Sequence, residues 1–204
     1  MKTTICTAVF VTLIGITSPG SSHGADTAET IVLAGGCFWG VEAVFNHTKG
    51  VTDAVVGYAG GLADTAQYET VSSGDTGHAE SVKVTFDPQK ISLAQILDVY
   101  FTVAHNPTEL NYQGPDHGTQ YRSTVFYATP AQKKSVEDKI AKLNAAHTFK
   151  SPIVTTLEPL KGFYRAEDHH QHYAELHPLD PYILINDAPK VVRLKTTYPA
   201  IYKN

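Results

Sequence analysis

The pattern of apolar residues predicts an α+β domain, in which helices pack on an antiparallel or mixed sheet. Segments with β-branched residues or period-two alternation are interleaved with segments of helical periodicity, and turn residues separate them. Of the 204 residues, 42% are hydrophobic and 18% are charged. This composition supplies one packed core and argues against disorder or a fibrous repeat.

The first predicted strand covers residues 30–34 (TIVLA), a short apolar run that Gly35 and Gly36 end. Apolar side chains then recur at helical spacing, which predicts a helix over residues 37–47. Residues 51–58 (VTDAVVGY) have the composition of a second strand.

The polar, glycine-containing stretch of residues 59–78 is too long for a plain connection. After it, residues 79–86 (AESVKVTF) alternate with period two and predict a third strand. Ser92 is a good N-cap for a helix that runs to about residue 104.

An irregular stretch, residues 105–120, precedes a fourth predicted strand at 121–127. A charged helix over 130–146 is indicated by Thr129, because a cap followed by proline is a helix start. Further expectations concern the last part of the chain: a fifth strand at 153–157, a helix at 166–177 and a basic, irregular tail from residue 189.

The order of the first six elements is β-α-β-β-α-β. This is the order of the split βαβ unit, the ferredoxin-like plait, to which the sequence adds a C-terminal helix and tail. No internal repeat or low-complexity linker interrupts it, so we expect a single domain.

The charge balance argues against a nucleic-acid-binding protein. Sixteen Lys and Arg residues oppose 20 Asp and Glu residues, a formal charge of −4, and no basic run is present. The two cysteines exclude a disulfide-dense scaffold.

Residues 1–24 have the features of a cleaved secretory signal. Lys2 precedes a short apolar stretch, and small residues follow up to Gly24. The stretch is short for a membrane span, although a retained anchor helix is the alternative. We therefore expect an exported protein, periplasmic or extracellular, with a mature domain of residues 25–204. If Cys6 is removed with the signal, Cys37 is the one remaining thiol.

Cys37 lies where a strand meets a helix start, in residues 35–40 (GGCFWG). Unpaired N–H groups and the helix dipole at this position favour a thiolate, the nucleophilic form of cysteine. Phe38 and Trp39 place apolar surface next to the sulfur, which suits a small apolar group of a substrate. The alternative interpretations are a small buried thiol at Cys37 and a core packing role for Trp39.

Two further loops carry polar residues into strands. Glu80 follows residues 73–79 (SGDTGHA), at the entrance of the third strand. Most glutamates are solvated surface charges, but aromatic neighbours would favour the neutral acid, which donates a proton. Tyr121 follows residues 114–120 (GPDHGTQ), and its phenol, like that of Tyr68, could bind a ligand oxygen.

Together these motifs resemble the A-type peptide methionine sulfoxide reductases. The resemblance rests on residues 36–40 (GCFWG), 74–80 (GDTGHAE) and 116–122 (DHGTQYR), and it extends to 57–61, 105–108 and 163–168. It covers about residues 30–175, and the family has an α+β core of the predicted type.

The resemblance implies a reaction and a role for each residue. Cys37 attacks the sulfur of methionine sulfoxide, and Glu80 protonates the sulfoxide oxygen, which Tyr68 and Tyr121 hydrogen-bond. The substrate-binding residues that it implies are Phe38 and Trp39, which enclose the methyl group, and Asp116 with its neighbour His117.

The resemblance also implies reduction of the S epimer, with methionine released and Cys37 left as a sulfenic acid. It requires no metal and no organic cofactor. Many family members resolve the sulfenic acid with C-terminal cysteines, which this chain lacks. We therefore expect recycling by an external reductant, either a small thiol or a thioredoxin-like protein. The expected partners are oxidised proteins that contain methionine sulfoxide, and we expect a monomer.

Two alternatives remain at this point. A hydrolase or acyl transferase could pair Cys37 with His78 or His117. A metal-binding module could use the histidines at 169, 170 and 172 with Glu167 and Asp168.

Overall fold

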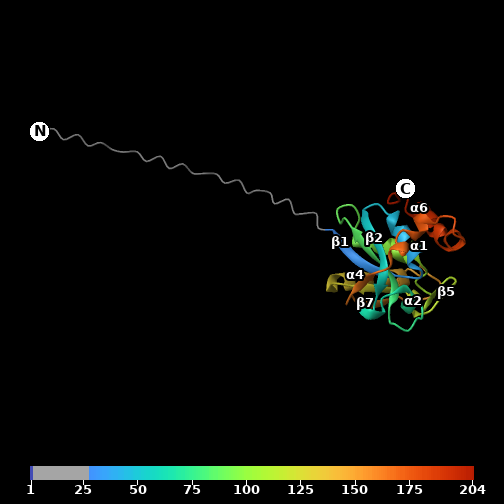
Figure 1. The fold of residues 1–204 in the computed structure, drawn as a ribbon. Coiled ribbons are helices and arrows are strands. Elements are labelled where there is room, and N and C mark those ends of the chain that lie inside the picture. The colour runs from blue at the N-terminus through green and yellow to red at the C-terminus, as the bar shows by residue number, and fades with distance from the viewer. Residues whose placement is uncertain (2–27) are drawn as a thin grey trace.

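A six-stranded mixed sheet is the centre of the structure, a computed structural model that describes Met1 and residues 28–204 (Figure 1). The predicted signal segment, apart from Met1, lies outside the described residues. The strands of this sheet are β1 (Glu29–Ala34), β2 (Val51–Ala59), β3 (Ala79–Phe86), β6 (Thr124–Tyr127), β7 (Thr156–Pro159) and β8 (Phe163–Arg165). A separate hairpin pairs β4 (Tyr112–Gln113) with β5 (Asp116–His117).

The strand order is β7-β6-β1-β3-β2-β8. Its four inner strands pair antiparallel in the order that a split βαβ unit requires, since each helix returns the chain to a strand two places away. β7 then adds parallel to β6, and β8 adds antiparallel to β2. The expected α+β class is confirmed, and the two outer strands make the sheet mixed.

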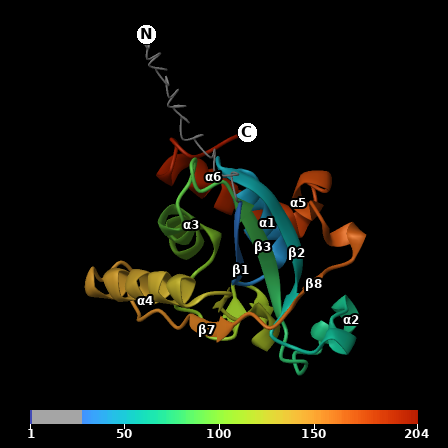
Figure 2. The ribbon, with the colours of Figure 1, turned by 90° about the vertical axis from the view of Figure 1, so that its left-hand side faces the viewer.

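The helices are α1 (Phe38–Asn46), α2 (Tyr68–Val71), α3 (Leu93–Val99), α4 (Pro130–Ala145), α5 (Tyr173–Leu176) and α6 (Ala188–Thr197). Single 3-10 turns lie at Ala63–Thr65, Thr119–Tyr121 and Asp168–His170, and π-helical turns at Tyr100–Ala104 and Ile183–Asp187. Figure 2 shows α3 and α4 to one side of the strands and α5 to the other. Within the described residues, no helix combines the length and the apolar character that crossing a bilayer requires.

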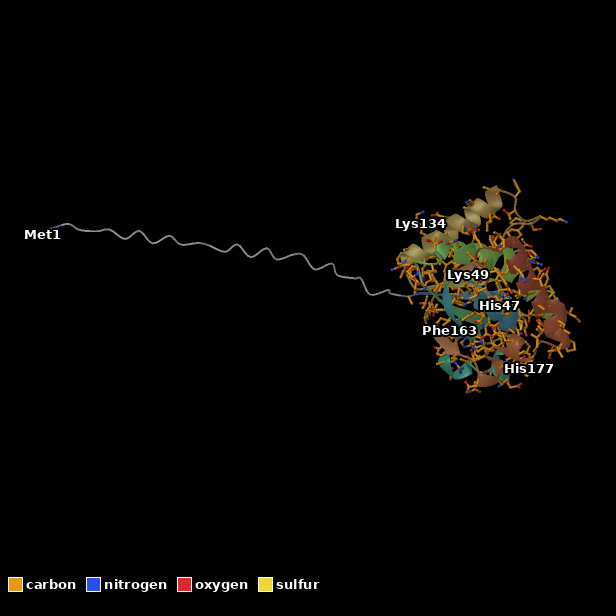
Figure 3. All side chains as sticks on the ribbon, turned by 90° about the horizontal axis from the view of Figure 1, so that it is seen from above. Met1, His47, Lys49, Lys134, Phe163 and His177 are labelled. Atoms are coloured by element: carbon orange, nitrogen blue, oxygen red, sulfur yellow. The ribbon has the colours of Figure 1, made fainter. Side chains whose placement is uncertain are left out.

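The main core lies between α1, α3 and one face of the sheet. Alternate strand residues such as Ile31 and Leu33 face it, and Val44 and Leu97 meet them from the helices. The opposite face of β1 packs in a smaller cluster around Phe126. Burial of these apolar side chains is the main stabilising contribution. In Figure 3, the labelled Lys134 of α4 lies at the outer edge of the domain, where α4 is solvated.

Most element starts agree with their local signals. β3 has the predicted bounds, and Thr129 caps α4 through the N–H of Gln132. Ser92 caps α3 in a capping box with Gln95. After α3 the chain continues as a π-helical turn, so the predicted helix to residue 104 is continuous but not α-helical throughout.

Three expectations about the last third were wrong. The predicted strand at 153–157 is displaced to β7, because its position is set by pairing with β6. The helix expected at 166–177 is broken into a 3-10 turn and α5 by His172, whose φ of 55° is left-handed. The tail from Pro189 is helix α6 up to Thr197, because proline is tolerated in a first helical turn and Leu194 buries against the core.

The fourth strand also starts later than predicted. Residues 119–121 form a 3-10 turn, and β6 begins at Thr124. This turn leaves Tyr121 outside the sheet, near the start of α1, because the N–H of Gly36 donates to its carbonyl at 3.2 Å.

Candidate active site

Cys37 is the N-cap residue of α1 and lies directly after the turn that ends β1. Gly36 makes this turn with a φ of +86°, and a Cβ there would lie 2.6 Å from the side chain of Gln113. Only glycine satisfies both conditions without strain. The Cys37 side chain is buried, at 7% exposure.

Glu80 lies on β3, beside the first turn of α1. Its Oε2 accepts a hydrogen bond from the backbone N–H of Phe38 at 3.0 Å, so the carboxyl group caps the helix that begins after Cys37. The Glu80 side chain therefore holds β3 against the start of α1, next to Cys37.

A cavity of about 150 Å³ opens between these elements. Seven of the eight predicted site residues line it: Cys37, Phe38, Trp39, Tyr68, Glu80, Asp116 and Tyr121. His117 does not line it; this side chain is exposed and stacks on Tyr112, with 5.4 Å between ring centroids.

Tyr182 also lines the cavity, and sequence analysis missed it. Its hydroxyl donates a hydrogen bond to Asp116, and its ring meets Trp39 edge-on, with 6.0 Å between ring centroids. One phenol among 11 tyrosines carries no local signal, and this one reaches the cavity only because the C-terminal segment folds back over α1.

The aromatic wall has a second layer. Trp39 stacks on Tyr173 at 3.9 Å, and the ring of His170 lies 5.3 Å from Phe38 and 4.5 Å from Tyr68. Glu167 accepts the backbone N–H of Tyr68 at 2.9 Å, which fixes α2 at the edge of the cavity.

Burial dominates the electrostatics of Glu80. Burial raises the pKa of this carboxyl most, the Phe38 N–H lowers it, and the charges of Asp116 and Asp187 raise it, which together bring it from 4.5 to about 8. Glu80 is therefore largely a neutral acid at neutral pH, the direction that aromatic surroundings indicated.

The Cys37 thiol behaves differently from expectation. Burial raises its pKa well above the usual range, followed by the negative charges of Glu80 and Asp187. The backbone N–H of Trp39 lowers the pKa, so the predicted effect of the helix start is present but outweighed. The resting side chain is a thiol.

The phenols and Asp116 follow the same rule. Burial, then the charge of Glu80, raises the pKa values of Tyr68 and Tyr121, which remain neutral donors. Burial also raises the pKa of Asp116, and the bond from Tyr182 opposes this. The cavity thus offers an apolar wall, several hydroxyl donors, a neutral carboxylic acid and a thiol.

The two alternative interpretations find no support in this geometry. His78 bonds to the backbone of Gly61 and Leu62, and neither it nor His117 lines the cavity that contains Cys37. Across residues 28–204, no group of three His, Cys, Asp or Glu side chains is arranged to hold a metal ion.

The chain is similar to known proteins over most of its length. The family model "Peptide methionine sulfoxide reductase" matches residues 29–200. "Peptide methionine sulfoxide reductase MsrA 2" of Mesorhizobium japonicum is 56% identical over 178 residues, which cover 87% of this chain and 91% of that protein.

Solved structures give the same result. Mxr1 from Saccharomyces cerevisiae in reduced form superposes with a TM-score of 0.69 and 36% identity, covering 74% of this chain and 87% of that one. Mxr1 in complex with Trx2 gives a TM-score of 0.50 and 26% identity, covering 78% and 94%. The chain therefore belongs to the A-type peptide methionine sulfoxide reductases, oxidoreductases that reduce the S epimer of methionine sulfoxide.

Proposed function

We propose that this chain reduces methionine-S-sulfoxide with Cys37 as nucleophile and Glu80 as proton donor. The observation that carries the assignment is the hydrogen bond from Phe38 N–H to Glu80, which holds a buried acid beside the residue that follows the thiol. A sulfoxide is a poor electrophile until its oxygen is protonated, so a sulfur nucleophile and a neutral acid are needed in one cavity.

The step balances as thiol plus sulfoxide giving sulfenic acid plus sulfide. The sulfur of Cys37 attacks the sulfoxide sulfur and forms a transient S–S bond. The S–O bond of the substrate and this S–S bond then break, and a new S–O bond on Cys37 leaves it as the sulfenic acid. Glu80 donates a proton to the oxygen and regains one from the thiol, so that no electrons or protons are gained or lost by the pair of reactants.

The remaining residues bind the substrate in this proposal. Tyr68 and Tyr121 hydrogen-bond the sulfoxide oxygen, and their raised pKa values support a donor role. Phe38 and Trp39 enclose the terminal methyl group. Asp116, which Tyr182 holds, contacts the polar part of the substrate.

We further propose that recycling is intermolecular and that the substrates are oxidised proteins. Cys37 is the one free cysteine among the described residues, and Cys6 is the only other cysteine of the sequence. A small thiol or a thioredoxin-like protein would attack the sulfenic acid, release water and form a mixed disulfide, which a second thiol resolves. The complex of Mxr1 with Trx2 supports a protein partner of this kind.

Export remains a proposal from the N-terminal sequence. Lys2 and the apolar residues after it favour cleavage near Gly24 and a periplasmic or extracellular location. N-terminal sequencing of the secreted protein tests both the export and the cleavage site.

The reaction is tested by mass spectrometry after one equivalent of a methionine sulfoxide peptide. We expect a gain of one oxygen at Cys37 and release of the reduced peptide, and neither in Cys37→Ser. An internal disulfide after one turnover would contradict the proposal of intermolecular recycling. Reduced peptide together with an unmodified Cys37 would contradict the assignment of Cys37 as the nucleophile.

A further inference from the structure

A buried ion pair lies beneath the first turn of α1. Lys190 Nζ is 3.0 Å from Asp187 Oδ1, and the exposed fractions of the two side chains are 19% and 0%. A fully buried carboxylate is costly unless every lone pair is satisfied. Yet Asp187 Oδ2 has no hydrogen-bond partner within residues 28–204. Packing alone gives no reason for a half-satisfied carboxyl group at this position, whose pKa burial raises and the Lys190 charge lowers.

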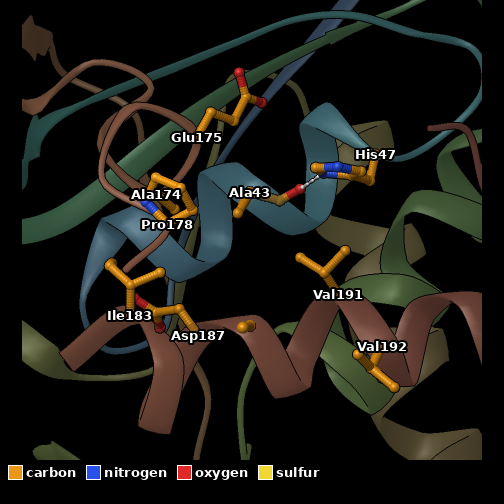
Figure 4. A pocket seen from close by; sticks show the side chains of 10 residues that line it. Ala43, His47, Ala174, Glu175, Pro178, Ile183, Asp187, Val191 and Val192 are labelled. Atoms are coloured by element: carbon orange, nitrogen blue, oxygen red, sulfur yellow. Dashed lines mark hydrogen bonds between the residues drawn. The ribbon is translucent and has the colours of Figure 1, made fainter. Parts of the chain in front are cut away.

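The pair approaches the backbone of α1 closely. A Cβ on Gly40 would lie 2.0 Å from Asp187 Oδ1 and 2.7 Å from Lys190 Nζ. Gly40 is the third residue of α1 and Cys37 is its N-cap, so about one helical turn separates them. Figure 4 shows Asp187 with Ile183 where the chain passes from the π-helical turn into α6, beneath α1.

Both charges act on the thiol. Asp187 raises the pKa of Cys37 and Lys190 lowers it, with Asp187 the larger of the two. Glu80 on β3 and the Trp39 N–H also act on this thiol. The phenols that interact with its charge are Tyr68, Tyr121, Tyr173 and Tyr182.

We propose that Asp187 and Lys190 are positioning residues of the reductase site, which together set the balance between thiol and thiolate at Cys37. This rests on the proposed role of Cys37 as the attacking sulfur. Asp187 adds to burial and Glu80 in keeping the resting sulfur protonated, and Lys190 offsets part of that charge so that the thiolate forms during attack. Because the thiolate is also the form that oxidants and alkylating agents attack, a proton on the resting sulfur protects it.

The test measures alkylation of Cys37 by iodoacetamide at pH 8, followed by peptide mass spectrometry so that Cys6 does not contribute. Asp187→Asn leaves the cation unopposed, and we expect alkylation about tenfold faster than wild type, the effect of a pKa lowered by about one unit. Lys190→Met leaves the carboxylate unopposed and slows alkylation several-fold, whereas Lys190→Arg keeps the wild-type rate.

The opposite directions separate this proposal from a structural role, because loosened packing would accelerate both variants. Asp98→Asn is the matched control, since it removes the acid of the ion pair between α3 and α4 without touching the cavity. If Asp187→Asn fails to fold, the Lys190→Met and Lys190→Arg variants carry the test. Equal or faster alkylation in Lys190→Met overturns the proposal. None of these readings needs reductase turnover, so the result is independent of whether Cys37 is the nucleophile.

Discussion

At the scale of single residues, environment decides the chemistry of the two central groups. Glu80 and Cys37 are both desolvated, and desolvation favours the neutral form of each. The neutral form of Glu80 is the form that can donate a proton, whereas the neutral thiol of Cys37 is the less nucleophilic form. Because burial opposes formation of the thiolate, the charged groups near the sulfur, Asp187 and Lys190 included, bear on whether it forms.

Glu80→Gln should slow the reductive step by about 100-fold or more, because the amide cannot donate the proton. Substrate binding should change much less, since the amide oxygen still accepts the Phe38 N–H. Single-turnover reduction of a sulfoxide peptide measures this, with the exposed Glu137→Gln of α4 as control. A normal rate near neutral pH would contradict the proton-donor assignment.

The pH dependence of the same step follows from the pKa of about 8. The acid form is needed, and it is present below this value. The contribution of Glu80 is therefore lost as the pH rises through about 8. The resulting fall in rate at high pH should be absent from the pH–rate profile of Glu80→Gln. If the variant shows the same fall in rate, another group causes it.

At the scale of elements, α1 depends on residues outside itself. Cys37 provides no side-chain cap, and the first N–H is satisfied by a carboxyl group from β3. The helix also tolerates no side chain at Gly40, because the ion pair of the C-terminal segment occupies that space. The start of α1 is thus where β1, β3 and α6 meet.

Gly40→Ala tests this packing. In an exposed helix the change would stabilise by about 1 kcal/mol, but here the Cβ would lie 2.0 Å from a buried oxygen. We expect a net loss of about 1–3 kcal/mol in the free energy of unfolding, measured by urea denaturation. Adding Asp187→Ala should recover part of the loss, since it removes the clashing group. If Gly40→Ala alone raises the free energy of unfolding, the C-terminal segment that carries Asp187 moves aside without cost.

At the scale of the whole molecule, buried carboxyl groups link stability to pH. Glu42 on α1 is 1% exposed and accepts the N–H of His172 at 3.0 and 2.9 Å, which ties α1 to the segment before α5. Burial raises its pKa from 4.5 to about 8. Together with Glu80, it makes the folded state bind more protons than the unfolded state in this range.

The free energy of unfolding should therefore fall as the pH rises from about 4.5 to about 8, because the unfolded chain ionises first. In Glu42→Gln this slope should be shallower, since one of the carboxyl groups that contribute to it no longer titrates. Urea denaturation at a series of pH values measures the slope. An unchanged slope would show that Glu42 is ionised in the folded protein.

Local signals were sufficient for much of the fold and the site. β3, the caps of α3 and α4 and the start of α1 were predictable because each depends on residues adjacent in sequence. The three-residue strand β8 and the π-helical turns were not, since so short a strand is stabilised only by pairing with β2. His117 was expected to bind substrate but does not line the cavity. A loop motif does not indicate which of two neighbouring side chains, Asp116 or His117, faces inward.

The α+β class, the family and seven residues that share one cavity were predictable because contiguous motifs and their periodicity encode them. The folded arrangement was needed to show that Cys37 rests as a thiol, that Tyr182 joins the cavity and that Asp187 and Lys190 lie under α1. Burial and Coulomb interaction depend on distances between segments far apart in the chain, and no local pattern contains those distances.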